Sequence, residues 1–225
     1  MISDSVLKQF LFLALHPEKG RVRIDSMRFR YALAGAYLME LLTRKEIKIE
    51  DKRINHSLRK NGEPVHDTIV EIFEKQKRPR RVRYWINRLS WKSRFIFRET
   101  MKYLSSSGLL RHEKHYFLGI IPVNRYFISD IRNQKDVVDK IRRVLLYNDS
   151  PSREVLMLVS LVRMTESEKL IAESKEERRL LRNKIKQLTD DKSGLIDPEV
   201  AEIQKSVLSA ITAARSAAVT VAASG

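Results

Sequence analysis

Residues 27–43, with the sequence MRFRYALAGAYLMELLT, are the stretch that most limits how this chain can fold. Apolar residues occupy nearly every face of a helix built from this stretch, which is typical of a helix at the centre of a core. The middle of the stretch carries the small residues Ala32, Ala34, Gly35 and Ala36. Because a helical Gly costs about 1 kcal/mol relative to Ala, Gly35 indicates close packing of a neighbouring segment. The sequence therefore predicts a central helix around which the other segments pack.

The other segments are predicted to be mostly helical, because long runs have a 3.6-residue apolar period and the 225 residues include only 7 Gly and 6 Pro. We expect helices at residues 6–15, 67–73, 81–89, 91–107, 129–147, from 152, at 175–188 and from 199 onward, with the Ala-rich end 210–225 packed into the bundle. Thr165 and Glu168 have the spacing of a capping box. Two segments with hairpin patterns are residues 46–54, turning around Asp51, and 109–121, turning near Glu113 and Lys114. The predicted fold class is mainly α, with residues 1–225 forming a single domain.

The charge of the chain points to a polyanionic partner. Lys and Arg number 44 against 28 Asp and Glu, which gives a net charge of +16. Nucleic acid, an anionic membrane face and a phosphorylated ligand all suit such a charge. Cysteine is absent, so disulfides, a thiolate nucleophile and a Cys-based zinc site are excluded. No secretory signal and no apolar run of the ~18 residues that a membrane span needs are present, so we expect a cytoplasmic protein that meets a membrane only from its surface.

A basic run with no acidic residue between Glu74 and Glu99 is the sharpest functional feature. Arginine binds phosphate well because its planar guanidinium reaches two oxygens at once. The residues expected to bind an anionic head group are Arg80, Arg81, Arg83, Arg88, Lys92, Arg94 and Arg98. Most aromatic residues in this run are expected in the core, with Trp85 and Trp91 as the candidates for contact with a membrane interface. The alternative for the whole run is a solvated basic face without a ligand.

No catalytic or metal-binding motif is evident. His112 and His115 lie three positions apart in a predicted hairpin, whereas the zincin motif needs histidines four positions apart on a helix. The chain lacks a G-x-S-x-G elbow and a phosphate-binding Gly loop. We therefore expect no enzyme activity, no cofactor and no metal.

Several motifs together resemble one known family. The runs LKQFLFLALHPEKGR and ALAGAYLMELLTRKEIKIE resemble the opening of the Golgi phosphoprotein 3 family, in which a Leu-rich helix reaches a K/E-G turn and a small-residue helix ends in an L-x-E-L signature. The similarity continues in matching order through VRYWINRLS, MKYLSSSGLLRHEKHYFLGIIPVNRYFISD and PEVAEIQKSVLSAITAA. The resemblance covers nearly the whole chain, and it implies a helical bundle ringed by amphipathic helices.

The resemblance also implies a function and its residues. Members of the family bind membranes peripherally through phosphatidylinositol 4-phosphate, and a projecting hairpin serves their self-association. That hairpin corresponds here to residues 109–118, with Leu109, Leu110, Tyr116, Phe117 and Leu118 as its apolar residues. The family's head-group pocket uses a Trp, an Arg in the small-residue helix, and two basic residues before the hairpin. These positions carry Asp25, Ala34, Arg94 and Phe97 here, with Arg98 adjacent, so the first two depart from the pattern.

We therefore expect a peripheral protein that binds phosphoinositide or another anionic phospholipid head group through the basic helices. The N-terminal arm of eukaryotic members has no counterpart before Met1, so we expect a bacterial member. Two alternatives stay open on the sequence alone: a nucleic-acid binder that uses the same basic helices, and an adaptor for a protein partner. The residues do not name the lipid, the oligomeric state or any cargo.

Overall fold

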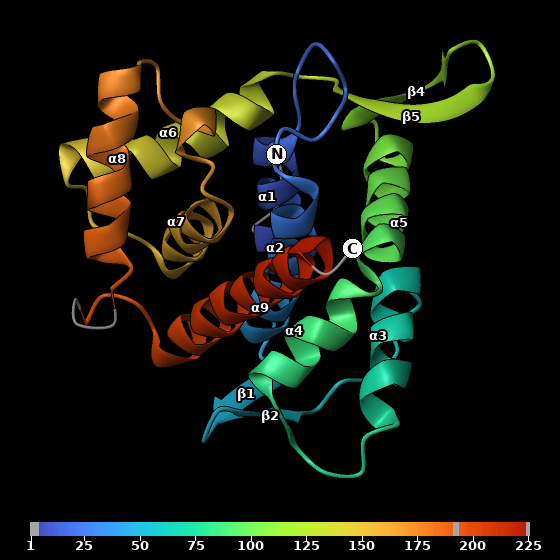
Figure 1. Ribbon diagram of the computed structural model, residues 1–225, viewed down its shortest axis with the longest axis vertical. Coiled ribbons are helices and arrows are strands. Elements are labelled where there is room, and N and C mark those ends of the chain that lie inside the picture. The colour runs from blue at the N-terminus through green and yellow to red at the C-terminus, as the bar shows by residue number, and fades with distance from the viewer. Residues whose placement is uncertain (1–4, 191–193, 224–225) are drawn as a thin grey trace.

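The computed structural model describes residues 5–190 and 194–223, and its centre is the predicted helix, α2 (Ser26–Thr43) (Figure 1). Around α2 pack α1 (Val6–Ala14), α4 (Val82–Ser90), α7 (Arg153–Thr165) and α9 (Pro198–Ala223). The small residues of α2 allow a neighbouring helix to pack closely, as predicted. A Cβ added to Gly35 would lie 3.0 Å from Val207 Cγ2 of α9, so Gly35 lets α9 approach closely. The prediction of a central helix is confirmed.

The first hairpin is confirmed and gains a third strand. Strands β1 (Ile47–Glu50) and β2 (Arg53–His56) pair antiparallel, and β3 (Arg80–Arg81) adds to the free edge of β2. The turn at Asp51 and Lys52 has both residues at positive φ, 47° and 61°, which two-residue hairpin turns require. The start of the basic run is therefore held in a strand at the lower end of the molecule in Figure 1.

The second hairpin is longer than predicted, and its expected turn is wrong. Strands β4 (Leu110–Phe117) and β5 (Ile121–Ile128) pair antiparallel, and the chain reverses at Leu118 and Gly119, not at Glu113 and Lys114. Gly119 accepts the positive φ of 73° without strain, whereas Glu113 and Lys114 lie in the middle of β4. Polar side chains suit both faces of this strand because the hairpin projects from the body of the protein (Figure 1).

The remaining helices follow the predicted periodicity with small shifts at their ends. They are α3 (Pro64–Glu74), α5 (Ser93–Ser106), α6 (Arg132–Tyr147) and α8 (Lys175–Leu188), and a 3₁₀ turn, η1 (Glu168–Leu170), precedes α8. The capping box is wrong, since Thr165 ends α7 and its hydroxyl donates to the Leu161 carbonyl. Glu168 is instead buried and pairs with Arg182 at 3.2 Å.

The Ala-rich end of α9 behaves differently from the expectation. Val200, Ile203, Val207 and Ile211 are buried against the core, but most residues from Thr212 to Thr220 are exposed. Alanine and threonine offer too little apolar area to hold that part of the helix against the body. Over residues 5–190 and 194–223 the fold is mainly helical with two small antiparallel sheets, as predicted, and none of these helices is long and apolar enough to cross a bilayer.

Candidate functional site

A cleft of about 780 Å³ lies where the start of α2 meets the junction of α4 and α5. Asp25 places α2, because its carboxylate accepts a hydrogen bond from the Arg28 N–H at 3.0 Å and caps the helix. The chain leaves α4 at Ser90 and enters α5 at Ser93, so the side chains of this junction border the cleft. Two basic side chains line the cleft, Arg30 from α2 and Arg94 from α5.

Arg30 has an unused hydrogen-bond donor in this cleft. Its Nη2 donates to the Tyr31 hydroxyl at 3.2 Å, and its guanidinium lies 6.0 Å from the centre of the Trp91 ring. The Nε–H is buried and has no hydrogen-bond partner among the described residues. A buried donor without a partner costs about 1–3 kcal/mol, so an acceptor that reaches this atom gains that amount back. Arg30 therefore brings a guanidinium with unsatisfied hydrogen-bonding capacity to the lining of the cleft.

The start of α5 adds further positive potential. No side chain caps this helix, whose first residues Ser93 and Arg94 both line the cleft. Uncapped N–H groups and the helix dipole favour an anion at such an end. The side chain of Arg94 is exposed, while Ser93 is largely buried at 7% exposure. Ser93 and Arg94 thus bring a hydroxyl and a guanidinium to the lining of the cleft, and phosphate oxygens accept from both kinds of donor.

The far side of the cleft is apolar and leads to the projecting hairpin. Phe29 and Phe97 line it and meet edge to face, with ring centres 5.6 Å apart. Phe97 then meets Tyr126 of β5 at 6.0 Å. This aromatic chain connects the cleft to the base of the hairpin. Trp91 stands at the rim with 82% of its surface exposed, which is unusual for an indole ring.

The structure divides the predicted basic residues into groups. All seven are exposed, but only Arg94 lines the cleft. Arg80 and Arg81 belong to β3, so the nine-residue α4 separates them from the cleft by roughly 13 Å of helix. Arg83 and Arg88 lie on α4, Lys92 lies at the junction of α4 and α5, and Arg98 lies on α5. The run is therefore an extended basic surface, and the cleft occupies one part of it.

Arg98 is partly neutralised by its neighbour. Its Nε donates to Glu99 at 2.8 Å, and Lys102 pairs with the same carboxylate at 3.1 Å. The hydrogen bond from Arg98, followed by that from Lys102, holds the pKa of Glu99 below its usual range. Glu99 consequently stays ionised, and Arg98 contributes less free positive charge than Arg94.

Three residues predicted to contact a partner or a membrane belong to the core or pack against it. Trp85 is 1% exposed and stacks on Phe73 with ring centres 3.6 Å apart, so its assignment to a membrane interface is wrong. Trp85 shares the buried face of α4 with Val82, Ile86 and Leu89, so its ring points into the core. In the hairpin, Leu110 is buried and Leu109 packs against the core, so they anchor its base.

The tip of the hairpin carries the exposed apolar side chains. Tyr116 is 62% exposed and Leu118 78% exposed, and Ile120 and Ile121 extend the same patch. The side chain of Phe117 lies outside the part of the chain that the structure describes. Two of the predicted hairpin residues, Tyr116 and Leu118, are thus available to a partner.

Sequence reasoning missed Arg30. The position that carries the pocket arginine by resemblance is Ala34, which is fully buried here, and Arg30 lies one helical turn earlier on the same face. Asp25 stands at the position that corresponds to the tryptophan of the family's head-group pocket, and here it caps α2. The four-residue spacing from Ala34 was the signal that would have identified Arg30.

Metal-ligand geometry is lacking in the part of the chain that the structure describes, where no cluster of three or more His, Asp or Glu side chains could hold an ion. His112 Nε2 donates to the Asn124 side-chain oxygen at 2.8 Å, and His115 contacts Glu113 at 2.9 Å. Both histidines thus have local partners on an exposed hairpin.

Comparison with known proteins gives the family. No curated protein matches the chain. The profile of the family described as Golgi phosphoprotein 3 (GPP34) matches residues 7–210. The match includes α2, the cleft, both small sheets and most of the buried part of α9. The chain therefore belongs to the Golgi phosphoprotein 3 family.

Proposed function

We propose that this protein is a non-enzymatic peripheral membrane protein that binds the phosphorylated head group of an anionic phospholipid between Arg30 and Arg94. The single observation that supports this most is that Arg30 of α2 and Arg94 of α5 line the same cleft. The family is known for Golgi peripheral proteins that bind phosphatidylinositol 4-phosphate, so this lipid is the first ligand to test. Its phosphomonoester offers the oxygens that two guanidinium groups recognise.

The surrounding surface supports reversible attachment to a bilayer. Each basic side chain near an anionic surface contributes ~1 kcal/mol, so Arg83, Arg88 and Lys92 add to the attraction without entering the cleft. The exposed ring of Trp91 suits the interfacial region, where an indole has both apolar and polar contacts. Attachment of this kind weakens as ionic strength rises, because the Debye length shortens.

Vesicle flotation with matched arginine variants tests the proposal. The vesicles contain neutral phosphatidylcholine alone, with phosphatidylserine, or with phosphatidylinositol 4-phosphate. Arg30→Gln and Arg94→Gln each remove a charge-assisted hydrogen bond, and we expect a roughly 10- to 100-fold loss of phosphoinositide binding. Arg88→Gln is the control, since it removes the same charge from an exposed site that does not line the cleft. It should weaken binding only about fivefold.

Two outcomes would end the proposal. One is equal flotation with neutral and anionic vesicles. The other is an Arg88→Gln variant that loses as much binding as Arg30→Gln, because the cleft would then have no special part. A mobility shift with duplex DNA, run alongside, detects nucleic-acid binding by the same basic surface.

We also propose that the β4–β5 hairpin joins two copies of this chain. Among the described residues no third strand joins this sheet, and only near its base does the Tyr126 N–H of β5 donate to the Gly20 carbonyl, at 2.9 Å. The tip carries exposed Tyr116, Leu118 and Ile120. Open edges and apolar tips favour pairing with another chain. Sedimentation of the protein should show a dimer or larger species that Leu118→Ser with Ile120→Ser converts to a monomer. A monomer without these substitutions would contradict the proposal.

A further inference from the structure

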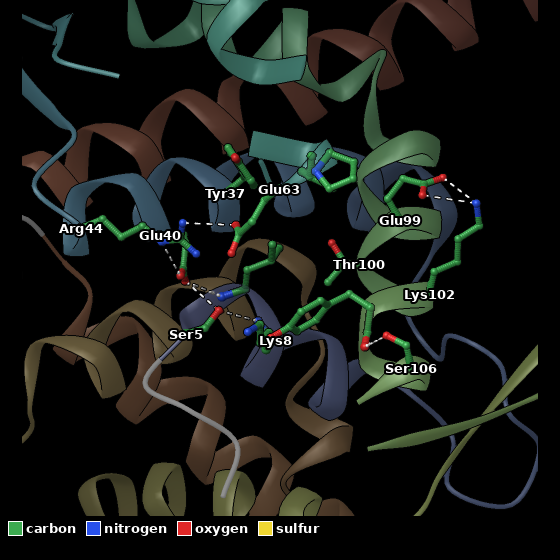
Figure 2. A pocket seen from close by; sticks show the side chains of 14 residues that line it. Ser5, Lys8, Tyr37, Glu40, Arg44, Glu63, Glu99, Thr100, Lys102 and Ser106 are labelled. Carbon is green, nitrogen blue, oxygen red and sulfur yellow. Dashed lines mark hydrogen bonds and ion pairs between the residues drawn. The ribbon is translucent and has the colours of Figure 1, made fainter. Parts of the chain in front are cut away.

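A second cavity, of about 350 Å³, lies on another part of the molecule and shares no lining residue with the cleft. It is enclosed by the start of α1, the second half of α2, the start of α3 and the middle of α5 (Figure 2). We propose that it binds an uncharged aromatic molecule of about two fused rings that carries one hydroxyl or N–H group. This inference does not depend on lipid binding.

The size of the cavity sets the size of the molecule. Cavities of 300–1,000 Å³ are typical of small-molecule sites, and an engineered cavity of about 150 Å³ holds benzene. A space of about 350 Å³ is roughly twice that, so it suits two fused rings. Leu7, Tyr37, Val65 and Tyr103 supply the apolar walls. Flat aromatic surfaces such as those of Tyr37 and Tyr103 favour an aromatic ligand.

The charges of the lining exclude an anion as the preferred ligand. Lys8, Arg44 and Lys102 stand against Glu40, Glu63 and Glu99, so the lining is neutral in a chain of net charge +16. The cations already have partners. Arg44 pairs with Glu40 at 3.2 Å and Glu63 at 3.5 Å, Lys102 pairs with Glu99 at 3.1 Å, and Lys8 lies 4.6 Å above the Tyr103 ring. A ligand carboxylate would compete with three existing carboxylates for these groups.

Thr100 supplies the polar contact. It is 6% exposed, and Figure 2 shows its hydroxyl turned toward the cavity. Among the residues that the structure describes, this hydroxyl has no hydrogen-bond partner, although helical threonines usually donate to a carbonyl of the preceding turn. Two other polar lining groups already have partners inside the protein. Glu40 accepts from Ser5 Oγ at 2.9 Å, and the Tyr37 hydroxyl meets His66 Nδ1 at 3.4 Å.

Burial keeps the Tyr37 hydroxyl protonated. It raises the pKa of this phenol well above its usual range; Arg44 opposes this shift, whereas the nearby carboxylates add to it. Tyr37 therefore presents a neutral wall at any physiological pH. The free hydroxyl of Thr100 and the half-exposed carboxylate of Glu63 remain as acceptors for one donor on the ligand. This is the basis for assigning a hydroxyl or N–H group to it.

The probe is 2-naphthol, and 2-naphthoate is its matched anion with the same rings. Binding to the full chain is followed by the fluorescence anisotropy of each probe at physiological salt. Non-specific attraction to a basic protein favours the anion, so the comparison separates cavity binding from surface charge. We expect 2-naphthol to bind at least tenfold more tightly than 2-naphthoate, a ratio that corresponds to about 1.4 kcal/mol.

Two lining variants and one control complete the test. Val65→Phe fills the apolar part and should abolish binding of 2-naphthol. Thr100→Val keeps the shape but removes the hydroxyl, and should weaken binding about fivefold. Thr212→Val makes the same change on an exposed turn of α9 and should have no effect. Thr100→Val still decides the question if circular dichroism shows that Val65→Phe does not fold.

The proposal is overturned if 2-naphthoate binds as tightly as 2-naphthol, or if neither lining variant changes binding. Loss of vesicle binding in Arg30→Gln leaves this result untouched, because Arg30 does not line the second cavity. The two proposals therefore succeed or fail separately.

Discussion

Replacing Gly35 by alanine tests whether close packing determines the central helix. Alanine favours a helix by about 1 kcal/mol over glycine. Its Cβ, however, would lie 3.0 Å from Val207 Cγ2 and 3.5 Å from Ile203 Cγ2, and both of these side chains are fully buried on α9. Overpacking of a filled core costs about 1–3 kcal/mol. We therefore expect Gly35→Ala to lower the free energy of unfolding by about 1 kcal/mol.

The sign of the effect should depend on Val207. Val207→Ala removes the carbon atom that the new Cβ would meet, so Gly35→Ala in that background should be neutral or stabilise by up to about 1 kcal/mol. Urea unfolding followed by far-UV circular dichroism at 25 °C gives the four free energies of this double-mutant cycle. A coupling of about 1–2 kcal/mol is expected for residues in contact. Stabilisation by Gly35→Ala alone, or simple additivity, would refute the packing explanation.

Other substitutions test the separate roles of surface, core and titratable residues. Trp91→Ala should lower vesicle binding severalfold without changing the melting temperature, whereas Trp85→Ala should cost about 3–5 kcal/mol of unfolding free energy in urea titrations. Glu40→Gln should lower the free energy of unfolding by about 1–3 kcal/mol, because the carboxylate is 7% exposed and pairs with Arg44. A decrease below about 0.5 kcal/mol, which is the effect of an ordinary surface substitution, would contradict this role of Glu40. Burial lowers the pKa of His56, so the folded state binds its proton less readily than the unfolded state. Stability should then fall as the pH drops below about 6.5, and His56→Gln should flatten this part of the urea-midpoint profile.

The central helix and most other helices were predictable because the signals that form a helix lie within its own stretch of sequence. Apolar period, a capping residue such as Asp25 and a scarcity of Gly and Pro act within one or two turns. The turn of the second hairpin was not predictable in this way. Glu113 and Lys114 are polar enough for a turn, yet they lie within β4 because the pairing with β5 continues to Phe117. Strand pairing is a contact between distant residues, and local polarity does not report it.

The candidate site was predictable only in part. Arg94 and Trp91 follow from the uncompensated basic run, but Arg30 belongs to another helix, 64 positions earlier than Arg94, and only packing of α2 against α5 brings the two together. Trp85 and Trp91 lie only six positions apart in the same basic run of the sequence. Their exposures of 1% and 82% differ because α4 ends at Ser90 and changes the direction of the chain between them.

By itself the sequence determined the helical class, the central small-residue helix, the net positive charge and the resemblance to a family, because these depend on residue types and their spacing. Only the tertiary structure decided which cations share a cleft, which tryptophan meets solvent, and that Thr100 faces a neutral cavity without a partner. Those properties arise from the relative placement of segments distant in the chain. That placement depends on how buried surfaces such as Gly35 against Val207 fit together, and no local pattern encodes the fit.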